Sequence, residues 1–344
     1  MNTLTMTFML TSLSTSTILT YRSYHWLIAW VGLELNTLSM LPIIIKPQHP
    51  RATEAATKYF LTQATAAALV LLSSTMNAWE TGQWSIINMT PTRTIIMTLA
   101  IFLKLGLVPT HFWYPEVLQG STMYTAMIIS TWQKIAPLSL LYLTSMNCPT
   151  EIFLIVGITS TIIAGMVGLN MTQTRKIMAF SSIGHMGWLI TMIPFNLNLT
   201  TFTLMMYITL TSSMFSMLAT MTTPTLKDMG QTHLCFPMMT TMMMLTLMSL
   251  GGLPPLSGFM PKLLILKTLT DMKLMILSTS LALTSLPSLY FYLRMSYITM
   301  MTSPPKTTTT QYKWRLKPRP NMIMSPLITM TIILLPMTPL LMCT

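Results

Sequence analysis

The sequence predicts an all-α polytopic membrane protein with about eleven transmembrane helices. Three observations predict this class. The chain is 52% hydrophobic and only 8% charged, its mean hydropathy is +0.60, and apolar runs of about 20 residues recur along its whole length. A soluble domain usually carries about 25% charged residues. We therefore expect lipid, in place of water, to surround most of the surface of the protein.

Other classes fit the composition less well. A net charge of +12 is compatible with nucleic-acid binding, but the basic residues are scattered between apolar runs, so no nucleic-acid partner is predicted. The three cysteines, Cys148, Cys235 and Cys343, lack the spacing of a disulfide framework or a zinc site. Residues 1–21 are long enough to span and lack a basic start, so we expect no cleaved presequence. The 38 methionines and abundant threonine suggest a mitochondrial gene.

Eleven apolar segments are long enough to span a membrane, and the fourth and ninth are interrupted by proline and glycine. Their connections are short, except for residues 222–237 and the polar basic stretch 303–321. The predicted spans are residues 3–21, 25–45, 56–78, 94–118, 122–143, 151–170, 177–195, 200–221, 238–270, 275–298 and 322–342.

The positions of the two interrupted spans indicate an internal repeat. Spans one to five (residues 1–145) and six to ten (146–300) form two five-helix blocks, each with a broken fourth helix; a basic loop and a C-terminal helix (301–344) follow. Because each block has an odd number of helices, the second is inverted relative to the first. Paired broken helices in inverted repeats indicate a transport site near the middle of the membrane.

The distribution of lysine and arginine predicts that the N-terminus lies on the matrix side. Residues 303–321 are then a headgroup-facing orientation signal, with partner docking as a second interpretation. One face receives Lys46, Arg51, Lys58, Arg175, Lys176, Lys227, Lys306, Lys313, Arg315, Lys317 and Arg319; the other receives Arg22, Arg93, Lys267 and Lys273.

Lys104, in "MTLAIFLKLGLVPTHFWYPEV", lies inside the fourth span. An ammonium at this depth costs at least about 2.5–3.5 kcal/mol, so it needs a polar partner. Pro109 lacks an N–H group, and we expect the break to leave carbonyls unpaired beside a hydrated cavity. The candidate partner is Glu34, ten residues into the second span. Movement of this carboxylate, or of its proton, would change the charge of the lysine; a static ion pair that fixes helix packing is the alternative.

Lys134 and Lys262 are the other lysines inside spans. Lys134 lies in the middle of "MIISTWQKIAPLSLLYL", beside Pro137. Lys262 follows the break in "LMSLGGLPPLSGFMPK", a position that we compare with that of Lys104. Snorkelling of Lys262 to the membrane surface is the alternative interpretation.

His185 occupies the second helix of the second block, where Glu34 stands in the first. An unperturbed imidazole has a pKa near 6.5 and could pass protons between lysines, although a lone buried histidine is often a packing residue. Ser181, Ser182 and Tyr207 are weaker candidates that would hold water. The sequence has no HExxH, nucleotide loop, GxSxG or CxxC motif, and no credible bis-histidine haem pair among His25, His49, His111 and His233. No metal or redox cofactor is therefore predicted in this chain.

Six ordered motifs resemble those of the antiporter-type membrane subunits of respiratory complex I. The resemblance covers essentially the whole chain and is closest to the form encoded in animal mitochondria. The motifs are "WVGLELNTL", "RATEAATKYFLTQA", "KLGLVPTHFWYPEV", "TWQKIAPLS", "GLNMTQTRKIMAFSSIGHMGW" and "GGLPPLSGFMPK".

This resemblance implies a proton-pumping subunit of the inner-membrane arm. Its partners would be the other membrane-arm subunits, including neighbouring antiporter-like subunits, and phospholipid. NADH, FMN, iron–sulfur clusters and ubiquinone would bind to other subunits of the complex. By position, Glu34 and Lys104 match the Glu–Lys pair of the family, Lys134 its central lysine, His185 its axial histidine and Lys262 its proton-exit residue.

The sequence departs from the family in two ways. Bacterial relatives carry fourteen helices, so the eleven predicted here resemble the animal form, which has lost three. The loss leaves an edge of the helix bundle that other subunits would cover. Some paralogues have glutamate where this chain has Lys262. Two alternative functions remain: a stand-alone cation/proton antiporter that uses the same lysines, and a scaffold whose charges are structural. Intramembrane hydrolysis is least favoured, because no nucleophile–base spacing is present.

Overall fold

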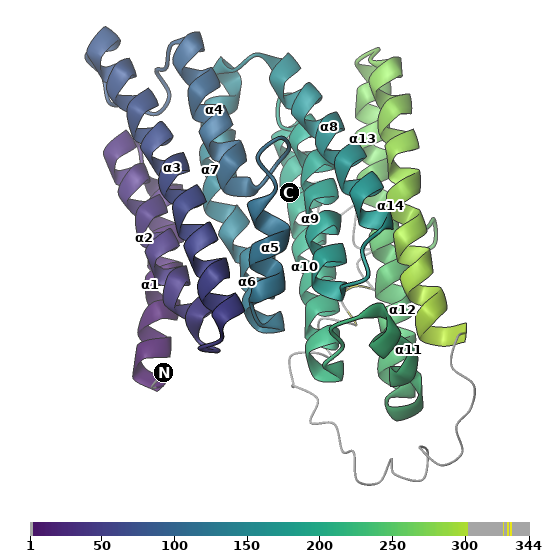
Figure 1. Ribbon diagram of the computed structural model, residues 1–344. Helices are drawn as coiled ribbons and strands as arrows, with labels where there is room; N and C mark the ends of the chain where they lie inside the picture. Colours follow the sequence, from purple (N-terminus) through teal and green to yellow (C-terminus); the bar gives the residue numbers. More distant parts are fainter. Residues whose placement is uncertain (1–2, 302–325, 327–328, 330, 332–344) are drawn as a thin grey trace. The chain divides into compact units, whose positions relative to one another are not determined.

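The computed structural model describes residues 3–301 together with residues 326, 329 and 331 (Figure 1). These residues form helices, with two isolated β-bridges and no strands in the part described, so the predicted all-α class is confirmed. Five of the described helices are long and apolar enough to cross a membrane, namely α2, α3, α8, α10 and α14. The basic stretch 303–321 lies outside the described residues, as does nearly all of the predicted span 322–342.

The chain divides into two compact units. Unit 1 contains residues up to Gly157 together with Ile193–Phe195, and unit 2 contains Ile158–Met192 and the residues from Asn196 onward. The boundary therefore falls inside α8 (Thr150–Leu169). Each unit has its own buried core, and each is described separately below.

Unit 1 is built around α3, which packs against α2, α4 and α5; α2 also packs against α1, and α7 against α1 and α4. The two histidines before α2 and α3 act as N-caps, because the Nδ1 atoms of His25 and His49 accept hydrogen bonds from the backbone N–H groups of Leu27 and Arg51, both at 3.2 Å. The elements of unit 1 are α1 (Thr3–Arg22), α2 (Trp26–Ile45), α3 (Pro50–Thr81), α4 (Pro91–Leu105), α5 (Trp113–Gly120), α6 (Met123–Ser130), the 3₁₀ segment η1 (Trp132–Lys134), α7 (Ile135–Thr144), the 3₁₀ segment η2 (Ser145–Asn147) and the first turns of α8.

The break expected in the span 94–118 is present, and the chain resumes as α5 after residues 106–112. The span 122–143, which we expected to be continuous, is also broken, so that prediction was wrong. Here α6 ends at Ser130 and the chain passes through η1 before α7 begins. Pro137 has no N–H group for the carbonyl of Gln133, which accounts for the irregular turn just before it.

Unit 2 is built around α14, which packs against α9, α11, α12 and α13, while α10 packs against α9, α12 and α13. Helix α11 contacts α14 near the C-terminal end of α14 (Figure 1). After α8, the elements of unit 2 are α9 (Thr174–Met192), α10 (Leu197–Met221), α11 (Leu226–Cys235), α12 (Pro237–Gly251), α13 (Phe259–Asp271) and α14 (Met275–Met301).

Two features of unit 2 bear on the sequence predictions. The ninth predicted span breaks between α12 and α13, where Gly252 takes the left-handed conformation (φ 80°) that ends α12. Residues 222–237, which we expect to be a longer connection between two spans, contain the short helix α11. This helix begins with a capping box in which the Thr225 side chain accepts from the Asp228 N–H and the Asp228 carboxylate accepts from the Thr225 N–H.

Large apolar side chains remain exposed along several helices. Leu4 on α1 and Ile276 on α14 are 80% and 85% exposed. Such faces are unusual on a soluble monomer and are expected where lipid or another subunit covers the helix. The exposed apolar surface therefore agrees with the membrane assignment made from composition.

Candidate functional site

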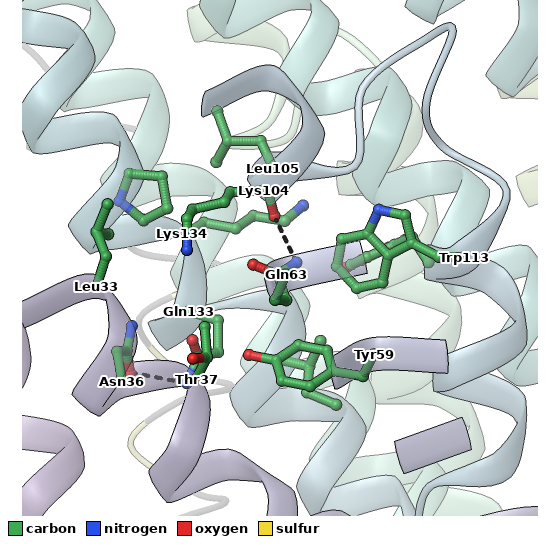
Figure 2. A pocket seen from close by; sticks show the side chains of 13 residues that line it. Leu33, Asn36, Thr37, Tyr59, Gln63, Lys104, Leu105, Trp113, Gln133 and Lys134 are labelled. Atoms are coloured by element: carbon green, nitrogen blue, oxygen red, sulfur yellow. Dashed lines mark hydrogen bonds between the residues drawn. The ribbon is translucent and has the colours of Figure 1, made fainter. Parts of the chain in front are cut away.

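Unit 1 contains a buried polar pocket, here called the Lys104 pocket, with about 370 Å³ of space that protein atoms do not fill (Figure 2). Seven elements from α2 to α7 contribute side chains to it. The lining residues are Leu33, Asn36, Thr37, Tyr59, Gln63, Lys104, Leu105, Trp113, Tyr114, Ile129, Gln133, Lys134 and Pro137.

Lys104 lies in the last turn of α4 and is 6% exposed. Its Nζ atom has no hydrogen-bond partner within the part of the chain described. The C-terminal end of a helix carries partial negative charge, so this position favours a cation electrostatically. An ammonium that lines a polar pocket without a fixed partner is suited to exchange protons with groups that enter the pocket.

Glu34 lies on α2, partly buried, and does not line the Lys104 pocket. Its carboxylate accepts a hydrogen bond from the Thr37 hydroxyl at 3.2 Å. It makes no ion pair with Lys104 among the described residues, although its charge acts on Lys104 and Tyr59 through space. The direct Glu34–Lys104 contact that both interpretations expected is therefore absent from the described residues.

Several carbonyls in the last turn of α4 accept hydrogen bonds from within unit 1. The Leu103 carbonyl accepts from the Gly106 N–H at 3.2 Å and from the Trp113 indole N–H at 3.2 Å. The Gln63 amide donates to the Lys104 carbonyl at 3.5 Å (Figure 2). Gly106 (φ 71°) supplies the left-handed turn that ends the helix. The polar character of the pocket therefore comes from side chains.

Lys134 ends the η1 segment and is 3% exposed. Its Nζ atom lies 5.1 Å from the centre of the Tyr114 ring, within the range of a cation–π contact. The neighbouring Gln133 amide donates to the Asn36 Oδ1 atom at 3.0 Å, which joins η1 to the helix that carries Glu34 (Figure 2). The irregular turn therefore directs both Gln133 and Lys134 into the pocket.

The two lysines share the pocket with neutral polar groups only. No carboxylate is among its lining residues, which include the amides of Asn36, Gln63 and Gln133. Like charges in a poorly solvated site raise each other's free energy. The lining of the pocket therefore supplies no negative counter-charge to either lysine.

Unit 2 contains a second polar pocket, here called the His185 pocket, with about 310 Å³ of unfilled space. Helices α8, α9, α13 and α14 line it. The lining residues are Thr161, Ala164, Gly165, Phe180, Ser181, Gly184, His185, Trp188, Lys262, Thr284, Ser288, Phe291 and Tyr292.

Lys262 lies in the first turn of α13, and its Nζ atom donates to the Gly251 carbonyl at 2.9 Å. The sequence comparison of Lys104 with Lys262 holds only in part. Along the chain, Lys104 comes before its helix break, whereas Lys262 comes after its break. The Lys262 amine nevertheless reaches the C-terminal end of α12, the first half of its broken helix, and Lys104 lies in the last turn of α4; both helix ends carry partial negative charge.

The structure brings His185 and Lys262 to the same pocket. The His185 Nε2 atom lies 3.3 Å from the Tyr292 hydroxyl, and its ring centre lies 5.8 Å from that of Tyr207. A neighbouring pocket of about 390 Å³ is also lined by His185, Trp188 and Lys262, and adds Tyr207. Proton-exchanging groups of three kinds, imidazole, amine and phenol, thus surround these two pockets.

Of the weaker candidates, Ser181 and Tyr207 line these pockets. Ser182 lines neither, and its hydroxyl donates to the Ala179 carbonyl of its own helix at 2.7 Å. The sequence interpretation missed Tyr292, along with the amide side chains of unit 1. The position of Tyr292 in the middle of an apolar helix was the sequence signal that could have identified it.

Other polar residues have structural roles. The Arg294 guanidinium on α14 donates to the Leu169 carbonyl at 2.9 Å and so caps the C-terminal end of α8. His111 is buried in the segment between α4 and α5, where its carbonyl accepts from the Tyr114 N–H. No three His, Cys, Asp or Glu side chains come together as a metal site in the described part of the chain.

Comparisons with known families identify the chain. A family model described as "NADH:quinone oxidoreductase/Mrp antiporter, TM" matches residues 23–287, and one described as "NADH dehydrogenase subunit 2 C-terminus" matches residues 289–342. NADH-ubiquinone oxidoreductase chain 2 of Xenopus laevis is 48% identical over 99% of this chain and 99% of the relative. The protein of the same name from Gallus gallus is 48% identical over 96% of this chain and 95% of the relative.

Solved structures share the fold at low sequence identity. A chain of respiratory complex I from Thermus thermophilus superposes with a TM-score of 0.84 at 21% identity, covering 99% of this chain and 80% of that chain. A chain of the Mrp complex from a Dietzia species superposes with a TM-score of 0.83 at 15% identity, covering 96% and 74%. The helices, pockets and relatives agree, and this chain belongs to the NADH-ubiquinone oxidoreductase chain 2 family of membrane proteins.

Proposed function

We propose that this chain is a proton-translocating membrane-arm subunit of mitochondrial NADH:ubiquinone oxidoreductase, and that protons pass through the Lys104 and His185 pockets. The observation that carries the proposal is that each unit holds a lysine in a polar pocket beside a broken helix. Buried amines are costly in a membrane and are usually retained for function. The names of the relatives support the assignment to complex I.

In the Lys104 pocket, the charge state of Glu34 sets how favourable a proton is on Lys104. When Glu34 is charged and near, Lys104 holds its proton; when Glu34 is protonated or moves away, the proton passes to Lys134. Lys104 and Lys134 line the same pocket, and water in that pocket would carry the proton from one amine to the other. Mutual repulsion between the ammonium groups helps to move a single charge through the pocket.

In the His185 pocket, His185 and Lys262 exchange a proton, and Lys262 releases it. The imidazole is suited to this step because it can donate from one ring nitrogen while it accepts at the other. The hydrogen bond from Lys262 to the Gly251 carbonyl holds the amine beside the pocket when it is protonated. Quinone reduction elsewhere in the complex would drive both pockets through electrostatic changes.

The membrane layout that we propose has about eleven transmembrane helices, in two inverted five-helix repeats (1–145 and 146–300) and a C-terminal helix. The N-terminus lies on the matrix side of the inner membrane, which the excess of lysine and arginine on that face supports. The partners are other membrane-arm subunits, neighbouring antiporter-like subunits and phospholipid. NADH, FMN, iron–sulfur clusters and ubiquinone bind to other subunits, and this chain carries no redox centre.

Proton-to-electron ratios in reconstituted complex test the proposal. Complex carrying Lys134→Met or Lys262→Met is placed in proteoliposomes, and NADH oxidation is measured together with proton uptake. Both variants are expected to lower the ratio or the coupled turnover, because each removes a proton-carrying amine. Lys267→Met is the matched control, since Lys267 is an exposed lysine on the same helix as Lys262. Unchanged ratio and turnover in both test variants would refute the site assignment.

The second candidate, a stand-alone cation/proton antiporter, rests on the fold shared with the Mrp complex. The high identity with complex I subunits over nearly the whole chain favours the first function. The isolated chain in liposomes distinguishes the two, because only a stand-alone antiporter exchanges cations for protons without partner subunits.

A further inference from the structure

Tyr292 is a buried phenol in the His185 pocket that the sequence interpretation did not identify. It lies on α14, is 1% exposed, and lines the pocket together with His185 and Lys262. Its hydroxyl is 3.3 Å from the His185 Nε2 atom. A buried hydroxyl needs a hydrogen-bond partner to offset its desolvation, and His185 provides one.

This contact bears directly on proton exchange at His185. A neutral imidazole has one N–H donor and one acceptor nitrogen, and the hydrogen bond at one nitrogen determines which of them carries the proton. The Tyr292 hydroxyl can either donate to Nε2 or accept from it, so the contact fixes the orientation of the ring in both tautomers.

The titratable groups that face His185 come from three packed helices. They are Tyr207 on α10, Lys262 on α13 and Tyr292 on α14. The residues of α8 that line the pocket, Thr161, Ala164 and Gly165, carry no titratable group. Of the three, Tyr292 makes the hydrogen bond to Nε2, while Tyr207 contacts the ring.

We propose that Tyr292 is a positioning residue that holds the His185 imidazole in the orientation needed for proton exchange with Lys262. The inference rests on the proposed function of the His185 pocket. Tyr292 itself neither gains nor loses a proton in this account. It acts through His185, so its effect disappears when the imidazole is removed.

The test compares Tyr292→Phe with Tyr290→Phe in the assembled complex. Tyr290 lies on the same helix but is 59% exposed, which makes it a matched control. The pH dependence of proton pumping is measured in proteoliposomes. Tyr292→Phe should shift the midpoint by about half to one pH unit, the size expected for one lost hydrogen bond, whereas Tyr290→Phe should leave it unchanged. An unchanged midpoint in Tyr292→Phe would overturn the inference.

A double variant separates positioning from a general structural effect. In a His185→Gln background, Tyr292→Phe should cause no further shift, because the group that the phenol positions is gone. An equal shift in both backgrounds would show that Tyr292 acts independently of His185 and would overturn the proposal. If Tyr292→Phe fails to assemble, Tyr292→Leu, which also removes the hydroxyl without adding a titratable group, is measured instead. A displaced midpoint in that variant supports the proposal, and an unchanged one contradicts it.

The two proposals fail in different ways. If Lys262→Met retains full pumping, the proposed function of the pocket is wrong. If Lys262→Met loses pumping while Tyr292→Phe keeps the original pH profile, the function stands and only the positioning role is wrong.

Discussion

The two pockets stabilise their buried amines differently. In unit 1, Lys104 has no hydrogen-bond partner among the described residues, and the nearby charge is that of Glu34, which lies outside the pocket lining. In unit 2, Lys262 donates to a helix-terminal carbonyl and shares its pocket with an imidazole. The first amine therefore depends on a charge that can change, and the second on a fixed dipole and a titratable neighbour.

The breaks beside these amines also differ. In unit 1, the end of α4 is fixed by side chains, because the Gln63 and Trp113 side chains donate to its last carbonyls. In unit 2, the turn after α12 is fixed by close backbone packing, with Gly258 against the Ser249 carbonyl. The break after α4 should therefore tolerate small changes of backbone position better than the break after α12.

The largest effect is expected from Gly258→Ala. A Cβ atom at this position would lie 1.8 Å from the Ser249 carbonyl oxygen, so the backbone must move. The cost should be at least about 3 kcal/mol, and assembled complex should be largely lost. Native gels measure assembly. Gly184→Ala, where the nearest atom to the new Cβ is 3.5 Å away, is the control. Normal assembly of Gly258→Ala would contradict the packing argument.

The next effect concerns the charge beside the Lys104 pocket. Glu34→Gln keeps the size of the side chain but removes the charge that acts on Lys104. Proton pumping should fall at least about tenfold, which corresponds to about 1.4 kcal/mol. Glu54→Gln, on the exposed face of α3, should pump normally. Equal activity of the two variants would mean that unit 1 does not depend on a changing carboxylate charge.

A smaller effect is expected from the amide pair that joins α2 to η1. Asn36→Leu and Gln133→Leu should each lower pumping about fivefold, because loss of a buried hydrogen bond of about 1 kcal/mol lets η1 move. The double variant should be no worse than either single variant, since both remove the same contact. The measurement is a double-mutant cycle of pumping rates for the unsubstituted protein, the two single variants and the double variant. Additive losses would show that the two side chains act independently.

The smallest effect is expected at the Lys58–Glu116 ion pair, which joins α3 to α5 at 2.6 Å. Both side chains are about half exposed, and exposed pairs contribute little to stability. Glu116→Gln should therefore leave turnover and assembly unchanged, as measured by NADH oxidation and native gels. A loss greater than about twofold would indicate that the position of α5, and with it Trp113, depends on this pair.

The sequence predicted the helical class and singled out Lys104, Lys134, His185 and Lys262, because an ionisable group within a long apolar run stands out. The structure buries Lys104 and Lys134 and leaves His185 and Lys262 half-buried. The sequence also predicted the breaks after α4 and α12, where glycine and proline are concentrated. The break before Lys134 was missed, although Pro137 was the available signal. A single proline within an apolar run is compatible with a kinked but continuous helix.

The remaining site contacts join residues far apart in the chain. Gln133 and Asn36 are separated by 97 positions, and Tyr292 and His185 by 107. Helical periodicity reports only which side chains share a face, so it gives no sign of these pairs. The short helix α11 was missed for another reason: its polar residues resemble a loop unless the capping box at Thr225 is recognised.

The central claim is that buried amines exchange protons inside hydrated pockets. A high-resolution map of the assembled complex tests it most directly, by locating water around Lys104, Lys134, His185 and Lys262. The account predicts ordered waters within hydrogen-bond distance of the Lys104 and Lys134 amines, and between His185 and Lys262. Dry pockets filled by side chains or lipid, or amines that point into bulk solvent, would contradict it.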